Sequence, residues 1–241
     1  MPIRCEKLHF AFLQKANHSN SEYLKSLSAA KRDILLNEAK DIVFESLVKV
    51  PEIDPEVRNH LRQIEKKNIC VPCTNKGQYV VAEYPADFYR RLRQTAKVTR
   101  KGCGERELLI HVLQSDKLTE SLKSPYWSPS YEYEETIGDD GEEGFYVWHN
   151  GQFEVKQVCF DYIRKIANIA CPSLEDCGSY IDDEGNTVNT DSAFEIDATY
   201  FWRKVVDVAV LLAKRNVDDV TNYQTQLQAI LFTSGRQRET T

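Results

Sequence analysis

The sequence has few of the features that identify membrane-spanning, secreted or methionine-rich proteins. Its 241 residues contain one methionine, which excludes a methionine-rich adaptable surface. No apolar run approaches the roughly 20 residues that a membrane-spanning helix needs. Residues 1–30 lack a long apolar run followed by a small-residue cleavage site, so we expect no signal peptide. We find no internal repeat of about 20–50 residues.

Motifs of common enzyme families are also missing. The chain has no G-x-S-x-G, no P-loop and no G-x-G-x-x-G, and none of its five histidines lies in an H-E-x-x-H pattern. The acidic stretch 182–191 lacks the ligand spacing of a calcium loop, which indicates a solvated turn. We therefore expect a protein that is not an enzyme and that holds no cofactor and no metal ion.

The cysteines do not follow a recognisable framework. The seven are Cys5, Cys70, Cys73, Cys103, Cys159, Cys171 and Cys177. An odd number at irregular spacing, in a chain long enough to bury a core, indicates reduced thiols in a cytosolic setting. Cys70 and Cys73 form a C-x-x-C, but no second pair has zinc-ligand spacing. We expect incidental thiols there, and a zinc site that recruits a distant pair is the alternative.

The composition is that of an ordinary globular protein. Charged residues make up 28% and hydrophobic residues 41%, so the chain can form one or two domains with a sizeable core. The formal net charge of −6 argues against nucleic acid as the main partner.

The clearest helix signal lies in the stretch 197–232. Its polar residues fall on one narrow arc at about 100° per residue, so we expect a helix that is buried on most sides. The arc consists of Arg203, Lys204, Asp207 and Lys214. A second, amphipathic helix is predicted from Ser28, a good N-cap, to Val48, with Asp33, Asn37 and Lys40 on its polar side. Its apolar face can cover the first helix, which leaves the arc for solvent or a neighbouring subunit.

Strand signals concentrate in the middle of the chain. The expected strands are residues 78–84, 107–113, 145–148 and 153–158. Asn150-Gly151 is a strong hairpin signal and predicts that the last two strands pair. Residues 86–93 are expected to form a short helix or turn, and the acidic stretch 132–144 an exposed loop or hairpin tip.

These patterns predict an α+β fold in which the N- and C-terminal parts form a helical bundle with an inserted β-rich, antiparallel module. The expected domains are a helical bundle of residues 1–70 and 172–241 and a β-rich domain of residues 71–171.

Clusters of opposite charge are the candidates for contacts between subunits. A basic segment runs from Arg90 to Arg106 with Glu105 as its only acid. The simplest interpretation of this segment is a face exposed to solvent. If the segment instead binds a partner, contact with the acidic stretch of an adjacent subunit is favoured over contact with DNA phosphates. The residues predicted at the interface are Arg90, Arg91, Arg93, Glu134, Glu135, Asp139, Asp140, Arg203 and Lys204.

The order of several segments resembles one protein family. The segments are ILLNEAKDIVFE (34–45), EYPADFYRRL (83–92), QSDKLTESLKSPYWSPS (114–130), FYVWHNGQFEVKQVCFDYIRKIANI (145–169) and FWRKVVDVAVLLAKRNVDDVTNYQTQLQ (201–228). This succession resembles the neck, or head–tail connector, ring proteins of crAss-like tailed phages. Those proteins are similar in plan to the adaptor (tail tubular protein A-like) proteins of short-tailed phages. Three features depart from the family pattern: an isoleucine at Ile166 where a proline is expected, the acidic stretch 132–144, and the cysteine content.

The resemblance implies a structural role in the virion, with no catalytic residue. Such proteins form rings, commonly of twelve copies, that contact the portal protein and further neck or tail rings. Genomic DNA passes through the lumen without specific binding, and no membrane is involved. The expected location is the neck of a virion, after synthesis in the host cytoplasm. The alternative is a non-catalytic DNA-binding or assembly accessory phage protein.

Overall fold

The chain divides into two compact units in a computed structural model. The described residues are 3–18, 26–49, 61–124, 126–182, 185–196, 199–215 and 220–232. Unit 1 comprises Met1–Gln63 and Ile166–Thr241, and the barrel unit comprises Ile64–Lys165. Each unit is described by itself.

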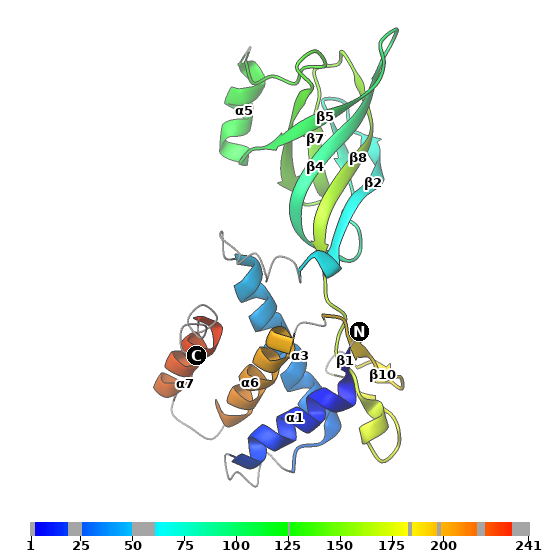
Figure 1. Cartoon of the computed structure of the whole chain (residues 1–241). Coiled ribbons are helices and arrows are strands. Elements are labelled where there is room, and N and C mark those ends of the chain that lie inside the picture. The colour runs from blue at the N-terminus through cyan, green and yellow to red at the C-terminus, as the bar shows by residue number, and fades with distance from the viewer. Residues whose placement is uncertain are drawn as a thin grey trace, which may run out of the picture. The chain divides into compact units, whose positions relative to one another are not determined.

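The barrel unit is a closed sheet of seven strands (Figure 1). The strands are β2 (Glu65–Asn75), β3 (Tyr79–Ala82), β4 (Phe88–Arg100), β5 (Gly104–Val112), β6 (Glu135–Gly141), β7 (Gly144–Trp148) and β8 (Glu154–Arg164). Around the barrel the order is β2-β3-β7-β6-β5-β4-β8, and β8 pairs again with β2. Because closure gives every strand two neighbours, the barrel has no free sheet edge.

One pair of neighbouring strands, β5 and β6, runs parallel, and the other pairs are antiparallel. A parallel pair cannot be joined by a tight turn and needs a crossover connection. Helix α5 (Ser115–Lys123) lies in that connection. The barrel is therefore mixed, and its chain path depends on a helix that belongs to the same unit.

Apolar side chains fill the barrel interior. The buried cluster is Val80, Ala82, Ala96, Val98, Leu108, Ile110, Tyr131, Phe145, Val147, Phe153, Val155, Val158, Phe160 and Tyr162. Gly138 on β6 makes room for one of the aromatic rings, because a Cβ there would lie 2.4 Å from Cζ of Phe145. A barrel of this size holds a packed core of side chains rather than a pore.

The predicted fold class is wrong. Helix and strand each account for 36% of the structure, and the strands form a closed mixed barrel rather than an antiparallel module inserted in a helical bundle. The prediction failed for two reasons. Residues 86–93, expected as a helix or turn, belong largely to β4, the longest strand and one that pairs with both β5 and β8. The parallel pairing of β5 with β6 has no local sequence signal.

Two further strand predictions also need correction. Asn150-Gly151 does not close a hairpin, because β7 pairs with β3 and β6 while β8 pairs with β2 and β4. The acidic stretch 132–144 needs correction only in part: residues 135–141 form β6, but the predicted hairpin tip is confirmed, because a tight turn at residues 142–143 joins β6 to β7. The strands predicted at 78–84, 107–113 and 145–148 are confirmed as β3, β5 and β7 within a few residues, and the strand predicted at 153–158 is the first half of β8, which continues to Arg164.

The helices of unit 1 are α1 (Cys5–His18), α3 (Ala29–Lys49), α6 (Thr199–Arg215) and α7 (Val220–Phe232). Two short ladders accompany them: β1 (Ile3–Arg4) pairs with β11 (Ala193–Phe194), and β9 (Tyr180–Ile181) with β10 (Thr187–Val188). A 3-10 turn, η2, spans Pro172–Leu174. A second, η1, spans Arg62–Ile64 at the boundary of the two units.

The helix predicted from Ser28 to Val48 is confirmed as α3. The Ser28 hydroxyl accepts a hydrogen bond from the Lys31 backbone N–H (3.3 Å), as an N-cap should. Leu36, Ala39 and Val43 are fully buried, and α3 packs against α6. The predicted covering of one helix by the other is therefore correct.

The stretch 197–232 contains two described helices rather than one. Helix α6 is buried on most of its surface, as predicted, and packs against α1, α3 and α7. Two of the four residues of its polar arc are engaged within unit 1, however. Asp207 pairs with Lys15 of α1, and Lys204 donates a hydrogen bond to the Leu231 carbonyl of α7 (3.0 Å). Among the described residues, no helix is long and apolar enough to cross a membrane.

Candidate functional site

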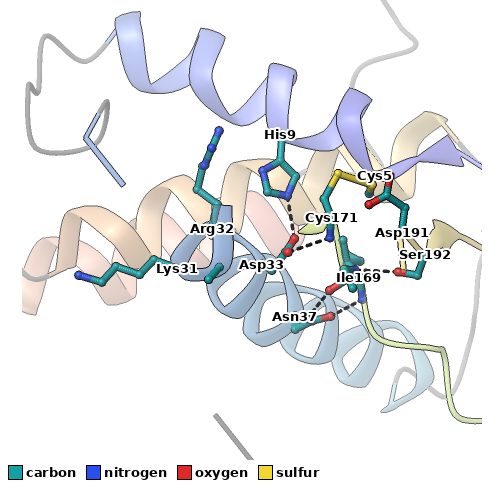
Figure 2. Close-up of polar contacts among 12 residues, drawn as sticks. Cys5, His9, Lys31, Arg32, Asp33, Asn37, Ile169, Cys171, Asp191 and Ser192 are labelled. Carbon is teal, nitrogen blue, oxygen red and sulfur yellow. Dashed lines mark hydrogen bonds and ion pairs between the residues drawn. A yellow bond between two sulfur atoms is a disulfide. The ribbon is translucent and has the colours of Figure 1, made fainter. Parts of the chain in front are cut away.

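A disulfide bond between Cys5 and Cys171 lies in unit 1 (Figure 2). It joins the first residue of α1 to the segment that precedes η2, across 166 positions of sequence. A second disulfide links Cys70 on β2 to Cys159 on β8, which face each other in the antiparallel register. The prediction of reduced thiols is therefore wrong for these four cysteines, because the tertiary fold brings together partners that their spacing does not indicate.

The C-x-x-C of Cys70 and Cys73 does not act as a unit. Cys70 is bonded to Cys159, while Cys73 is a free thiol that packs against the barrel core. Burial raises the pKa of the Cys73 thiol to about 11, so it stays protonated and unreactive at neutral pH.

A buried carboxylate, Asp33 of α3, lies beside the Cys5–Cys171 bond (Figure 2). It accepts three hydrogen bonds: from His9 Nε2 of α1 (2.7 Å), from the Cys171 backbone N–H (2.9 Å) and from the Tyr180 hydroxyl (2.6 Å). Asp33 and His9 are each 1% exposed. Such a carboxylate is tolerated in the interior because its lone pairs are occupied.

The tyrosine of the Asp33 cluster is kept in its protonated form. Burial, and then the hydrogen bond to Asp33, raises the pKa of Tyr180, so its hydroxyl remains a donor. The other ring nitrogen of His9, Nδ1, is buried without a hydrogen-bond partner among the described residues. The cluster therefore joins α1, α3 and the segment around Cys171 through one acceptor.

The polar side of α3 continues this contact. Asn37 exchanges two hydrogen bonds with the backbone of Ile169, donating to its carbonyl (2.8 Å) and accepting from its N–H (2.7 Å). Lys40, 2% exposed, donates to Asn168 Oδ1 (2.8 Å) and to the Ile166 carbonyl (3.4 Å). Burial lowers the pKa of Lys40. The i, i+4, i+7 spacing of Asp33, Asn37 and Lys40 marks a stripe that holds residues 166–171 in place.

A cavity of about 280 Å³ adjoins the cysteine pair. It is lined by Arg4, Cys5, Glu6, Asp191, Ser192 and Ala193. The two sulfur atoms and a carboxylate oxygen of Asp191 all lie within 4.8 Å of one another. Asp191 is itself positioned by a hydrogen bond from the Ser173 backbone N–H to Oδ1 (3.1 Å). Two sulfurs and a carboxylate converge here from three separate segments.

The charged residues predicted to lie at an interface pair largely within the barrel. Arg91 of β4 binds Asp140 of β6 in a bidentate manner, with distances of 2.7 and 3.1 Å, and the Tyr84 hydroxyl donates to the same carboxylate. Burial acts to raise the pKa of Asp140, but the hydrogen bonds from Arg91 and Tyr84 outweigh it, so the pKa falls. The expected attraction between basic and acidic segments therefore operates inside one chain.

The remaining predicted residues are dispersed. Glu134 contacts Arg106 (3.3 Å), and Glu135 lies 3.4 Å from Nε2 of His111. Arg93 lines a small polar cavity with Asn68 and Asp161, while Arg90 lies on β4 and Asp139 on β6. In unit 1, Arg203 lies over the Trp202 ring (5.7 Å) and Lys204 is buried. Seven of the nine predicted residues therefore lie in the barrel unit and two, Arg203 and Lys204, in unit 1.

Three exposed aromatic side chains form a feature that the sequence analysis missed. Tyr126, Trp127 and Tyr133 are 88%, 61% and 80% exposed, and all lie in the connection between α5 and β6. We call this set the aromatic segment. A cluster of large aromatics in eight residues of a polar connection was the available signal.

The aromatic segment is anchored by its neighbour Tyr131, which is buried. The Tyr131 hydroxyl donates to the Cys103 carbonyl (3.2 Å), and the guanidinium groups of Arg100 and Arg106 lie 5.5 and 4.7 Å from its ring centroid. The same two arginines pair with Glu132 and Glu134. Tyr133 is thus held between two ion-paired residues.

No protein-family model matches the chain, and a search of curated proteins finds none similar to it.

Proposed function

We propose that this protein is a virion structural subunit that forms an oligomeric neck ring between the portal and the tail of a tailed phage. The role is geometric and uses no catalysis: copies assemble around a lumen through which genomic DNA passes without specific binding. The observation that carries the proposal is the aromatic segment, displayed on a rigid barrel, in a chain whose segment order resembles neck ring proteins.

The chemistry of the aromatic segment favours a protein partner. Trp and Tyr are the residues that most often dominate protein–protein contacts, because they bury a large area at a small cost in side-chain entropy. Anchoring through Tyr131, Arg100 and Arg106 reduces the ordering cost further. In a ring, each copy places one of its surfaces against a different surface of the next copy. One exposed segment per subunit is therefore enough to supply one side of every contact in the ring.

The packed barrel and the paired charges support the same role. The interior holds apolar side chains, which favours a structural module over a container for a ligand. Arg91, Arg100 and Arg106 of the basic segment are engaged with acids of the same chain. Charge neutralised in this way contributes little to phosphate binding, which depends on free cationic groups. The alternative of a DNA-binding accessory protein is correspondingly weaker.

The proposal is tested by the mass of the assembled particle. We expect native mass spectrometry of the purified full chain to show a ring-sized oligomer, and we expect the chain in purified virions. Trp127→Ala combined with Tyr133→Ala should shift the population to smaller species, with a loss in association of about tenfold or more. Ile181→Ala is the matched control, since Ile181 is 69% exposed but lies in unit 1, and it should leave the oligomer unchanged.

Two results would contradict the proposal. A chain that remains monomeric at high concentration and is missing from virions is not a ring subunit. A gel shift with DNA that disappears as salt rises, shown by the monomer, would instead support the accessory DNA-binding role.

A further inference from the structure

The Cys5–Cys171 pair differs from the other disulfide in having a carboxylate oxygen close enough to both sulfurs for all three atoms to bind one metal ion. The sulfurs and an Asp191 oxygen lie within 4.8 Å of one another. Among the described residues, no other three cysteine, histidine, aspartate or glutamate side chains bring their ligand atoms this close to one another. The Cys70–Cys159 pair therefore provides an internal comparison: the same bond without a third ligand.

We propose that Cys5, Cys171 and Asp191 form a binding site for a zinc-type divalent cation when the disulfide is reduced. Two thiolates and one carboxylate are ligands that zinc accepts, and three protein ligands with one open position are a common arrangement. The proposal does not depend on the ring role, because it concerns a site within unit 1 of a single chain.

The oxidised and metal-bound forms are connected by a balanced reaction. A dithiol reductant transfers two electrons and two protons to the Cys5–Cys171 bond, which yields two thiols and leaves the reductant as a disulfide. The cation then replaces the two thiol protons, which pass to solvent, so that two sulfur–metal bonds form. Asp191 contributes its carboxylate without a change of oxidation state. The bond and the metal site are thus alternative states of the same two sulfurs.

The surrounding structure holds the three ligands together without the sulfur–sulfur bond. Pairing of β1 with β11, Arg4 opposite Ala193, places the start of α1 beside the segment that carries Asp191. The Cys171 backbone is fixed by Asp33 and the Asp191 carboxylate by the Ser173 N–H. Reduction therefore leaves a preorganised set of ligands, which is the condition for tight metal binding.

The cavity beside the pair provides access and the open position. Its volume of about 280 Å³ accommodates several water molecules, and Glu6 on its wall adds a second carboxylate. Asp33 is not a ligand in this site, because His9, Tyr180 and the Cys171 N–H already occupy its oxygens. Its role is to hold the Cys171 backbone.

Cobalt(II) titration of the full chain tests the proposal, because tetrahedral cobalt–thiolate sites absorb strongly. Protein reduced with tris(2-carboxyethyl)phosphine in oxygen-free buffer should bind one Co²⁺ per chain with a sulfur-to-cobalt charge-transfer band, and Zn²⁺ should displace it. Oxidised protein should show no such band. Cys171→Ser should abolish the band, and Asp191→Asn should weaken binding by about tenfold or more. The double variant Cys70→Ser/Cys159→Ser should bind as the wild type does.

Each contrary outcome is decisive. No charge-transfer band in the reduced wild type overturns the site, as does a band that survives Cys171→Ser. If Cys171→Ser fails to fold by circular dichroism, Asp191→Asn still decides, because Asp191 is exposed and asparagine keeps an oxygen for the Ser173 N–H. Unchanged Co²⁺ affinity in Asp191→Asn removes the carboxylate from the site and overturns the proposal.

Discussion

The two units bury different kinds of side chain. The barrel encloses an apolar cluster, and its ion pairs, such as Arg91 with Asp140, lie at the surface. Unit 1 also buries apolar residues of α3 and α6, but it places Asp33, His9 and Lys40 in its interior with hydrogen bonds to distant segments. The barrel is closed by backbone pairing along its strands, whereas unit 1 joins separated segments through polar side chains as well as a disulfide bond and two short ladders.

This difference has a physical consequence for how each unit responds to mutation. A closed sheet distributes its backbone hydrogen bonds over many residues, so its stability depends mainly on the volume of its core. Unit 1 instead depends on a polar hub, by which we mean the buried Asp33 and its three hydrogen-bond donors. Several interactions meet at this one side chain, so removing it leaves its donors without an acceptor. The comparison is tested below by substitutions in both units.

Phe160→Ala should have the largest effect. Phe160 is fully buried among the rings of Tyr84, Phe88 and Phe145, and truncation leaves a cavity that costs about 3–5 kcal/mol in the free energy of unfolding. Chemical denaturation and hydrogen exchange of barrel peptides measure it. Phe10→Ala, at a position 63% exposed on α1, is the matched control and should change stability little. Equal effects of the two would refute a core-dependent barrel.

Asp33→Ala should destabilise unit 1 by about 3 kcal/mol, since the change leaves the buried donors of His9 and Cys171 and the half-buried Tyr180 hydroxyl without this acceptor. Hydrogen exchange should rise in α1, α3 and residues 166–171 before it rises in the barrel. Glu38→Ala, on the exposed side of the same helix, is the control. A loss below about 1 kcal/mol would show that no polar hub exists.

Asn37→Ala should have an intermediate and local effect. It removes both hydrogen bonds to the Ile169 backbone, at a cost of about 1–3 kcal/mol. Amide exchange at Ile169 should accelerate while the barrel core remains protected. Protection that stays unchanged at Ile169 would mean that other contacts suffice to hold this segment.

Asp140→Asn should have the smallest effect and a defined dependence on pH. The pKa of Asp140 is lowered below its ordinary value of 3.8, so its stabilising contribution is present above that pH and is lost as pH falls through the lower folded pKa. Because its side chain is 57% exposed, we expect less than about 1 kcal/mol. The free energies of unfolding of the wild type and the variant should differ at pH 7 and converge as the pH falls through the folded pKa of Asp140. A constant difference would contradict the assignment.

Local patterns in the sequence were sufficient for several elements. The Ser28 cap, the apolar face of α3 and the broad burial of α6 follow from the residues of each helix, because helical periodicity is a local property. The aromatic and β-branched residues of 78–84 and 145–148 likewise indicated β3 and β7. Residues 86–93 were misjudged because charged side chains on the outside of β4 conceal its strand character.

The candidate site depends on contacts that no local pattern reports. Asp33, Asn37 and Lys40 lie on the polar side of α3, and periodicity alone assigns such a side to solvent. They are buried or half-buried because residues 166–171, distant in sequence, supply matching hydrogen-bond partners. Asp191 likewise belongs to a stretch that was predicted to be only a solvated turn.

The sequence by itself thus determined where the principal helices and most strands form, since those depend on neighbours within a few turns of chain. Only the tertiary structure decided that the strands close into a mixed barrel and that Cys5 meets Cys171 across 166 positions. Strand closure, cysteine pairing and the burial of a carboxylate are all consequences of long-range contact. Their free energies depend on partners that residue spacing does not specify.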